Sequence, residues 1–173
     1  MTTEVQSPLN DVDIKAVGDL VAAVQTDPAN ARTTWAARVR WKGAFRSEAA
    51  VRSFDPTPSD EPTALGGGDT AANPVEQLLG ALGNCLAVGY AANATVAGIA
   101  LDSLTVEVKG NVDLHVFLGL ADGHAGFDSI TATVRVESDA PRADLESLHE
   151  KVIRSSPVGH TLAAAVPVDI RLA

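Results

Sequence analysis

Hydrophobic positions near the N-terminus recur at the spacing of an amphipathic helix. The apolar side chains that share this spacing, and so one helix face, are Ile14, Val17, Leu20, Val21 and Val24. Asn10 and Asp11 precede this stripe and can cap a helix, and Asp27-Pro28 can end it. The pattern predicts a short helix between these two signals.

Residues 35–54 follow the alternation of polar and apolar side chains that is typical of β-strands. Residues 35–41 alternate, and residues 44–54 can pair back on them across a turn at Lys42-Gly43, which predicts a β-hairpin. Next comes FDPTPSDEPTALGGGDTAANP, a stretch with four prolines and three consecutive glycines that predicts a long loop. Long loops in compact domains are often functional or mobile.

A strong helix start follows this loop. Asn73 can cap the helix, Pro74 fits its first position, and Glu76 can reach back to the cap backbone. The next residues, to about Gly98, are apolar around most of the circumference, with glycine and alanine in the gaps. Such a helix is buried, and one small sheet and one other helix offer too little cover. A second copy of the chain would supply the rest, so we expect a homodimer, the commonest oligomer.

The C-terminal half predicts strands at 104–108, 112–116 and 129–137, then a helix that stops at Ser155-Ser156-Pro157, then a final strand at 166–172. The order of elements predicts an α+β fold, with helices grouped on one face of an antiparallel sheet.

Composition narrows the class of protein. The chain has 173 residues, 46% of them hydrophobic, which suits one folded domain with or without a short extension. Its net charge of −9 repels nucleic acid and anionic lipid. Residues 78–100 are too rich in alanine, glycine and polar residues for a membrane span. The N-terminus lacks the basic start and apolar segment of a secretory signal. These features predict a cytoplasmic protein that binds neither nucleic acid nor membrane.

One local exception to the acidic balance lies in residues 32–52. Six basic residues stand there against Glu48 alone: Arg32, Arg38, Arg40, Lys42, Arg46 and Arg52. The charged residues of the following stretch, to Glu76, are all acidic. A solvated strand face beside an acidic loop is the ordinary explanation of such a pattern.

Cys85 is the single cysteine, which excludes an internal disulfide and a thiolate zinc site. It is either a nucleophile or a small buried hydrophobe. An ionised thiol needs positive potential or hydrogen-bond donors. Because Cys85 lies beyond the reach of the helix dipole, hairpin arginines would have to supply that potential. The four histidines share no ligand spacing, so no metal or cofactor is predicted. His160 is the one histidine that could act as a base toward Cys85.

Two segments resemble the OsmC/Ohr family of osmotically inducible and organic hydroperoxide resistance proteins. They are NPVEQLLGALGNCLAVGYAANATVAGIALDSLTVEVKG and RSSPVGHTLAAAVPVDI. The resemblance divides the chain into an N-terminal helical extension, 1–31, and an OsmC-like domain, 32–173. It implies an intertwined homodimer in which antiparallel sheets from both chains wrap around long central helices.

The resemblance also implies a thiol peroxidase, an oxidoreductase of the oxidative stress response. In that family the helix cysteine attacks a peroxide, becomes a sulfenic acid, and condenses with a second cysteine before the Pro-Val segment. Cys85 stands at the first position and Ser156 at the second. This implies a one-cysteine hydroperoxide reductase, with Cys85 as nucleophile, Ser156 as hydrogen-bond donor to its thiolate, and an external thiol as reductant.

Two other residues of the family's site, a glutamate and an arginine, have less direct counterparts in this chain. Its glutamate directly follows Asn-Pro and helps hold a catalytic arginine, whereas Val75 stands there and Glu76 comes one residue later. One residue turns a helix by about 100°, so Glu76 need not face Cys85 and has capping as an alternative role. Arg46 lies at about the right distance before the cysteine. Its competitors for the catalytic position are Arg38, Arg40 and Arg52.

A different function fits the same residues. Ser156, Val75 and the apolar central helix are also compatible with a non-catalytic homodimer that binds a small apolar or lipid-like ligand in the cleft between the two chains. The sequence leaves both hypotheses open.

Overall fold

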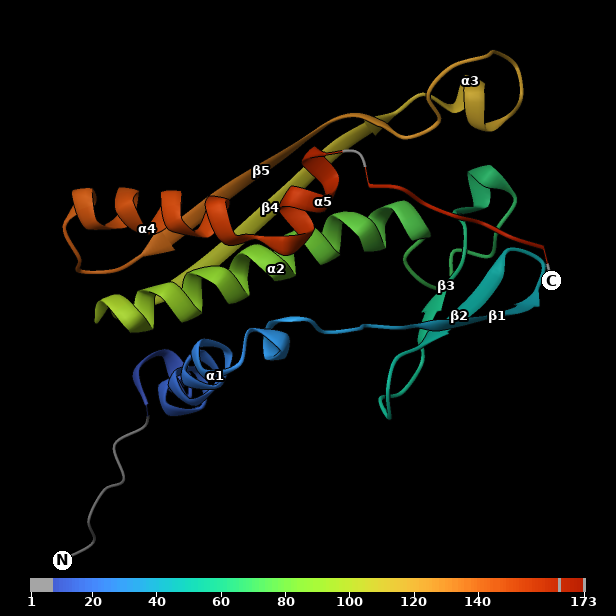
Figure 1. Ribbon diagram of the computed structural model, residues 1–173. Coiled ribbons are helices and arrows are strands. Elements are labelled where there is room, and N and C mark those ends of the chain that lie inside the picture. The colour runs from blue at the N-terminus through green and yellow to red at the C-terminus, as the bar shows by residue number, and fades with distance from the viewer. Residues whose placement is uncertain (1–7, 165, 173) are drawn as a thin grey trace, which may run out of the picture. The chain divides into compact units, whose positions relative to one another are not determined.

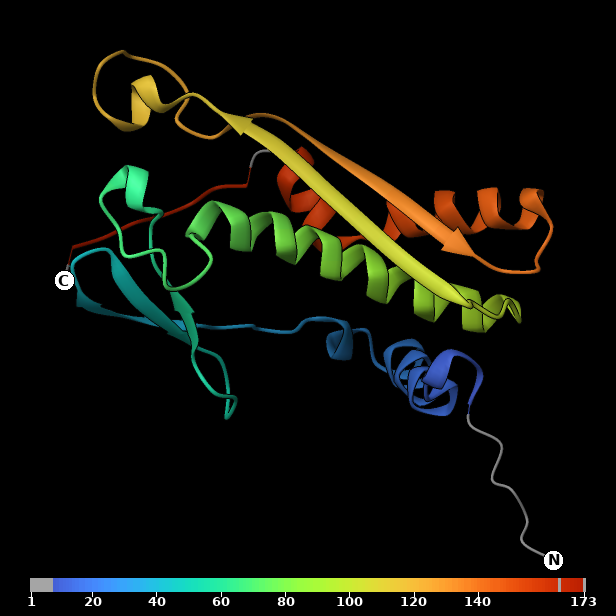
Figure 2. The same cartoon turned by 180° about the vertical axis from the view of Figure 1, so that it is seen from behind.

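The computed structural model describes residues 8–164 and 166–172 and has an α+β architecture (Figures 1 and 2). The chain forms two compact units. One is Lys15–Leu78, and the other combines the described residues of Met1–Ile14 and Leu79–Ala173.

The helix α1 and a three-stranded sheet belong mainly to the Lys15–Leu78 unit. Helix α1, Ile14–Thr26, confirms the N-terminal prediction. The antiparallel strands β1 (Arg38–Gly43), β2 (Arg46–Ala50) and β3 (Thr57–Ser59) lie in the order β1-β2-β3. Short 3-10 turns occupy Leu9–Asp11, Pro28–Ala31 and Thr63–Leu65.

The predicted hairpin is confirmed, but its turn lies two residues later than expected. Gly43 pairs with Arg46, so Ala44 and Phe45 form the turn instead of Lys42-Gly43. Ala44, the first residue of the turn, has a left-handed φ of +49°, and Gly43 before it has a φ of +97°. The register shifts between Trp41 and Gly43 to accommodate it.

The stretch predicted as a long loop contains β3, which the prolines concealed. Pro58 has no N–H to donate, and proline is confined to edge strands such as β3.

Asp60 organises the rest of this stretch. Its buried carboxylate accepts hydrogen bonds from the N–H of Glu61 (2.9 Å), Gly68 (3.1 Å) and Thr70 (3.2 Å), and from the Thr70 hydroxyl (2.8 Å). These bonds, the hydroxyl of Thr70 first, hold the pKa of Asp60 below its usual value. Gly67 is required because a Cβ there would lie 1.8 Å from the carbonyl oxygen of Glu61.

Helix α2, Pro74–Ala97, begins and ends as predicted. The N–H of Asn73 donates to Glu76 Oε2 (2.8 Å), and the N–H of Glu76 donates to Asn73 Oδ1 (3.0 Å). This reciprocal pair is the predicted capping box. The helix stops before Gly98, which has a left-handed φ of +73°.

Within one chain only one stripe of α2 is buried, so the expectation of a helix buried on all sides stays a prediction that needs a second copy of the chain. The buried positions are Leu82, Leu86, Tyr90 and Ala94. Val88 and Val96 remain 70% and 67% exposed. A single chain therefore leaves an apolar face of this helix uncovered.

The Leu79–Ala173 unit packs two helices on one face of a two-stranded sheet, as the fold class predicted. Strands β4 (Ser103–Val112) and β5 (Phe127–Glu137) are antiparallel, and α2 runs alongside them with α4, Arg142–Ser155 (Figures 1 and 2). Alternate residues of β4, such as Val106 and Val108, pack on the core formed by α2 and α4.

Two predictions in this unit are wrong. The strands expected at 104–108 and 112–116 are one strand, β4, followed by the short helix α3, Leu114–Phe117. Gly110 lets β4 continue, because a Cβ there would lie 2.6 Å from the Phe127 ring. Asp113 starts α3 by accepting the N–H of His115 (2.9 Å).

The final strand expected at 166–172 is also absent from the described part of the chain. A short helix, α5 (Pro157–Ala163), follows α4 instead, and residues 166–172 are extended and exposed. Ile170, for example, is 89% exposed. The alternating apolar pattern is present, but no described strand pairs with it, and a strand needs a partner for its backbone groups.

We expect Asp60→Asn to lower the midpoint of thermal unfolding at pH 7, because one amide oxygen cannot replace a carboxylate that accepts four hydrogen bonds. Since the folded pKa of Asp60 is lowered, its contribution is full above the usual value of 3.8 and is lost as the pH falls through the folded pKa.

Thermal melts followed by circular dichroism from pH 7 to pH 2 check this expectation. The unmodified protein should lose more stability over this range than Asp60→Asn. Asp55→Asn, at an exposed carboxyl in the same stretch, is the matched control. Equal loss in all three proteins would contradict a special role for Asp60.

Candidate functional site

The structure brings together two residues that the sequence analysis singled out. Cys85 Sγ lies 3.3 Å from Ser156 Oγ, although the two residues are 71 positions apart. Cys85 is half-buried on α2 and Ser156 is only 4% exposed. A sulfur–oxygen distance of this size allows a hydrogen bond in either direction.

Ser156 is held at the junction of two helices. It follows the last residue of α4 and is the N-cap of α5, where its Oγ accepts the N–H of Gly159 (3.1 Å). Gly159 is needed here because a Cβ would lie 2.9 Å from that oxygen. Since this bond uses Ser156 Oγ as acceptor, the hydroxyl proton is available to Cys85 Sγ. The Ser156 hydroxyl can therefore donate one hydrogen bond to a Cys85 thiolate.

The other predicted site residues have contacts of their own. The Glu76 carboxylate is engaged in the capping box with Asn73. Arg46 is exposed at the start of β2. Both belong to the Lys15–Leu78 unit, and their roles toward Cys85 stay predictions. The His160 ring donates from Nε2 to the carbonyl of Arg154 (3.0 Å), whereas the described hydrogen-bond partner of Cys85 is Ser156.

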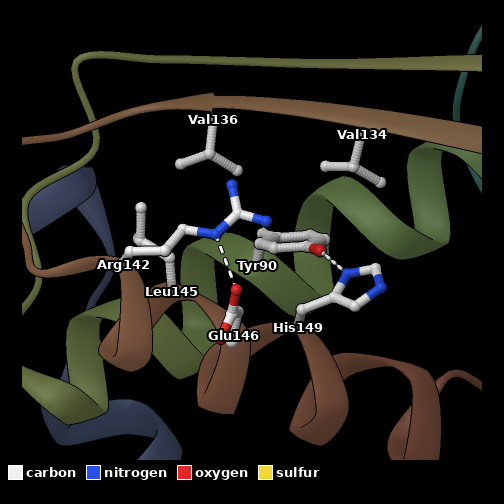
Figure 3. A pocket seen from close by; sticks show the side chains of 7 residues that line it. All are labelled: Tyr90, Val134, Val136, Arg142, Leu145, Glu146 and His149. Carbon is white, nitrogen blue, oxygen red and sulfur yellow. Dashed lines mark hydrogen bonds and ion pairs between the residues drawn. The ribbon is translucent and has the colours of Figure 1, made fainter.

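A second polar pair was missed by the sequence analysis. The hydroxyl of Tyr90 hydrogen-bonds His149 Nδ1 (Figure 3). The pair lies at a cavity of about 260 Å³ beneath Val134 and Val136 of β5, with the Arg142–Glu146 ion pair (2.8 Å) beside it (Figure 3).

Burial raises the pKa of Tyr90. Tyr90 shares the buried stripe of Leu82 and Leu86, and a buried tyrosine hydroxyl needs a partner. The place of Tyr90 in this stripe was therefore the sign in the sequence that its hydroxyl would have a hydrogen-bond partner.

Residues 8–164 and 166–172 lack two other features. They contain no group of three or more His, Cys, Asp or Glu side chains placed to hold a metal ion. Within the same ranges, every helix is too short or too polar to cross a membrane.

Known proteins resemble this chain in family and in fold. The family model described as OsmC-like protein matches residues 66–171. An OsmC-like protein from Mycoplasma pneumoniae has a similar structure, with a TM-score of 0.66 and 17% identity over 76% of this chain and 88% of that chain. An organic hydroperoxide resistance protein OsmC from Legionella pneumophila matches with a TM-score of 0.58 and 15% identity, covering 76% of this chain and 91% of that chain.

An organic hydroperoxide resistance protein from Elizabethkingia anophelis has a TM-score of 0.54 and 17% identity, covering 75% of this chain and 89% of that chain. At these identities the likeness concerns the fold. No sequence among the curated proteins matches the chain.

The contact between Cys85 and Ser156 predicts the behaviour of an added cysteine. In Ser156→Cys, mild oxidation with diamide should form an intramolecular disulfide with Cys85, because the two side chains already lie 3.3 Å apart. Intact mass after alkylation under denaturing conditions should show no alkylated thiol.

Ser155→Cys is the matched control. The Ser155 hydroxyl donates to the carbonyl of Lys151 (2.9 Å), so a cysteine there should remain alkylatable along with Cys85. Two free thiols in oxidised Ser156→Cys, or a disulfide in both variants, would contradict the described contact.

Proposed function

Because the chain belongs to the OsmC-like protein family, we propose that it is a thiol-dependent hydroperoxide reductase of the oxidative stress response, with Cys85 as its catalytic residue. The contact of Cys85 with Ser156 carries the proposal, since a buried hydroxyl donor favours the thiolate over the thiol. The solved hydroperoxide resistance proteins of similar fold support the substrate class.

The reaction balances with a single cysteine. The Cys85 thiolate attacks one oxygen of a hydroperoxide, the O–O bond breaks, and a proton from water completes the alcohol. Cys85 is oxidised to a sulfenic acid. An external thiol then displaces water to form a mixed disulfide with Cys85, and a second external thiol attacks this disulfide and releases Cys85 as the thiol.

The external thiol is needed because Ser156 occupies the position of the family's second cysteine. A hydroxyl donates a hydrogen bond to Cys85 Sγ but cannot form a disulfide. The sulfenic acid would therefore persist until a reductant from solution reaches it. Small thiols are abundant in the cytoplasm, the location that the sequence predicts.

Arg46 is the arginine that we assign to this site. Its guanidinium would stabilise the thiolate and the negative charge that develops on the leaving oxygen. The register of the hairpin supports a shared face for Arg38, Arg40 and Arg46, because Arg40 pairs with Glu48, two residues from Arg46 on β2. Glu76 would act indirectly, since its carboxylate is engaged at the start of α2.

Removal of the thiol should abolish turnover. We expect Cys85→Ser to consume cumene hydroperoxide at the background rate with dithiothreitol as reductant, while Ser155→Ala keeps the activity of the unmodified protein. Full activity in Cys85→Ser would contradict the proposal. No turnover in the unmodified protein, combined with an apolar molecule that copurifies in native mass spectrometry, would favour the non-catalytic ligand-binding alternative.

The same assay tests the positioning role of Ser156. A hydrogen bond to a charged group is worth about 1.5–3 kcal/mol, so Ser156→Ala should slow the turnover of cumene hydroperoxide about tenfold or more. An unchanged rate would show that Ser156 does not stabilise the Cys85 thiolate.

A homodimer is part of the proposal, and uncovered apolar faces in both units support it. On α2 the face that carries Val88 and Val96 is open to solvent. On the hairpin the face that carries Val39 and Trp41 is open as well, with Trp41 75% exposed. Exposed apolar patches of this kind mark association sites, and a second copy of the chain would cover them.

Light scattering tests this assembly. The unmodified protein should have twice the mass of one chain, and Val88→Asp should shift it toward the mass of one chain, because a carboxylate would be buried without a partner. Thr131→Asp, at an exposed strand position that pairs with Lys109, is the control and should remain a dimer. A monomeric unmodified protein at micromolar concentration would contradict the assembly.

A further inference from the structure

The hairpin has a basic face opposite its apolar one. Arg38 pairs with Ala50 and Arg40 pairs with Glu48, so these four side chains lie on the same side of β1 and β2. Val39 and Trp41 alternate with the arginines and lie on the other side. The basic residues noticed in the sequence are therefore concentrated on one surface.

This face is hollowed. A depression of about 350 Å³ is lined by the charged side chains of Arg38, Arg40, Glu48 and Arg52, with Ala50 and Pro56 among its apolar walls. Glu48 forms an ion pair with Lys42 (3.3 Å), which compensates its charge. Within residues 8–164 and 166–172, the three arginines of the depression form no ion pair with a carboxylate. The depression therefore carries a net positive charge.

Arg52 is held at the depression by an unusual backbone. Its φ of +51° is in the left-handed region, which residues other than glycine rarely occupy. A turn closed by the hydrogen bond from the Phe54 N–H to the Val51 carbonyl (3.2 Å) contains it, and its guanidinium lies over the Phe54 ring, 4.6 Å from the centroid. A left-handed backbone at a residue other than glycine costs local stability, and such residues cluster at functional sites.

We propose that this depression binds a small anion with two or more linked phosphate groups. Guanidinium groups donate paired N–H bonds that match phosphate oxygens, and three of them can neutralise more charge than a single phosphate carries. A volume of a few hundred Å³ is that of a small-molecule site. A nucleic acid fits less well, because the chain as a whole has a net charge of −9.

The depression uses other residues than the proposed thiol chemistry. Its charged side chains are those of Arg38, Arg40, Glu48 and Arg52, whereas Arg46 is the arginine assigned to Cys85. The inference does not rest on the proposed peroxidase activity, and it assigns a role to basic residues that the thiol chemistry leaves unused.

Calorimetric titration of the full chain with inorganic diphosphate, without divalent metal ions, tests the proposal. We expect submillimolar binding at about 0.1 M salt and at least tenfold weaker binding of orthophosphate. The double substitution Arg38→Ala with Arg40→Ala should weaken diphosphate binding at least tenfold. Arg142→Ala is the matched control, because Arg142 is an exposed arginine of the other unit, and it should change the affinity less than twofold.

Arg52→Gly gives a readout that holds even if the double variant is unstable. Glycine tolerates the left-handed backbone, so this variant should keep or raise the midpoint of thermal unfolding while it weakens diphosphate binding at least fivefold. Unchanged affinity in Arg52→Gly, or equal weakening in Arg142→Ala, would overturn the proposal. Tighter binding of a single-stranded oligonucleotide than of diphosphate would also overturn it in favour of a nucleic-acid surface.

Discussion

The packing of one stripe of α2 against α4 and the β4–β5 sheet is the contact on which the rest of the Leu79–Ala173 unit depends. The stripe repeats every four residues and consists of Leu82, Leu86, Tyr90 and Ala94. Gly89 permits the close approach of α4, because a Cβ there would lie 3.0 Å from a methyl group of Val152. Burial of this stripe sets the rotation of α2 about its own axis, so the direction of every other side chain on the helix follows from it.

The position of Cys85 follows from that rotation. Cys85 is the neighbour of Leu86 in sequence, so it lies at the edge of the buried stripe, half-covered and next to the end of α4. Ser156 reaches it there because α4 stops and α5 starts at the same residue. The proposed reactivity of this thiol rests on two features of its surroundings, a hydroxyl beside the sulfur and partial access to solvent.

Local signals in the sequence were sufficient for some elements and misleading for others. The start of α2 was predictable because Asn73 and Glu76 satisfy each other's backbone within one turn. The prediction that a strand ends at Val108 was wrong. Gly110 does not interrupt β4 but makes room for the Phe127 ring of its partner strand, β5. The segment 166–172 has the alternation of a strand, yet whether such a segment pairs depends on an available sheet edge and not on its own residues.

The sequence by itself determined the bounds of α1 and α2 and the end of α4, the single thiol of the chain, and the family to which it belongs, because these depend on neighbouring residues or on their identity. Tertiary structure alone decided that Cys85 meets Ser156 across 71 positions, that Tyr90 finds His149, and that three arginines surround one depression. Such contacts depend on how buried stripes and strand registers bring distant segments together, and the free energy of that packing is shared among many residues that no local pattern reveals.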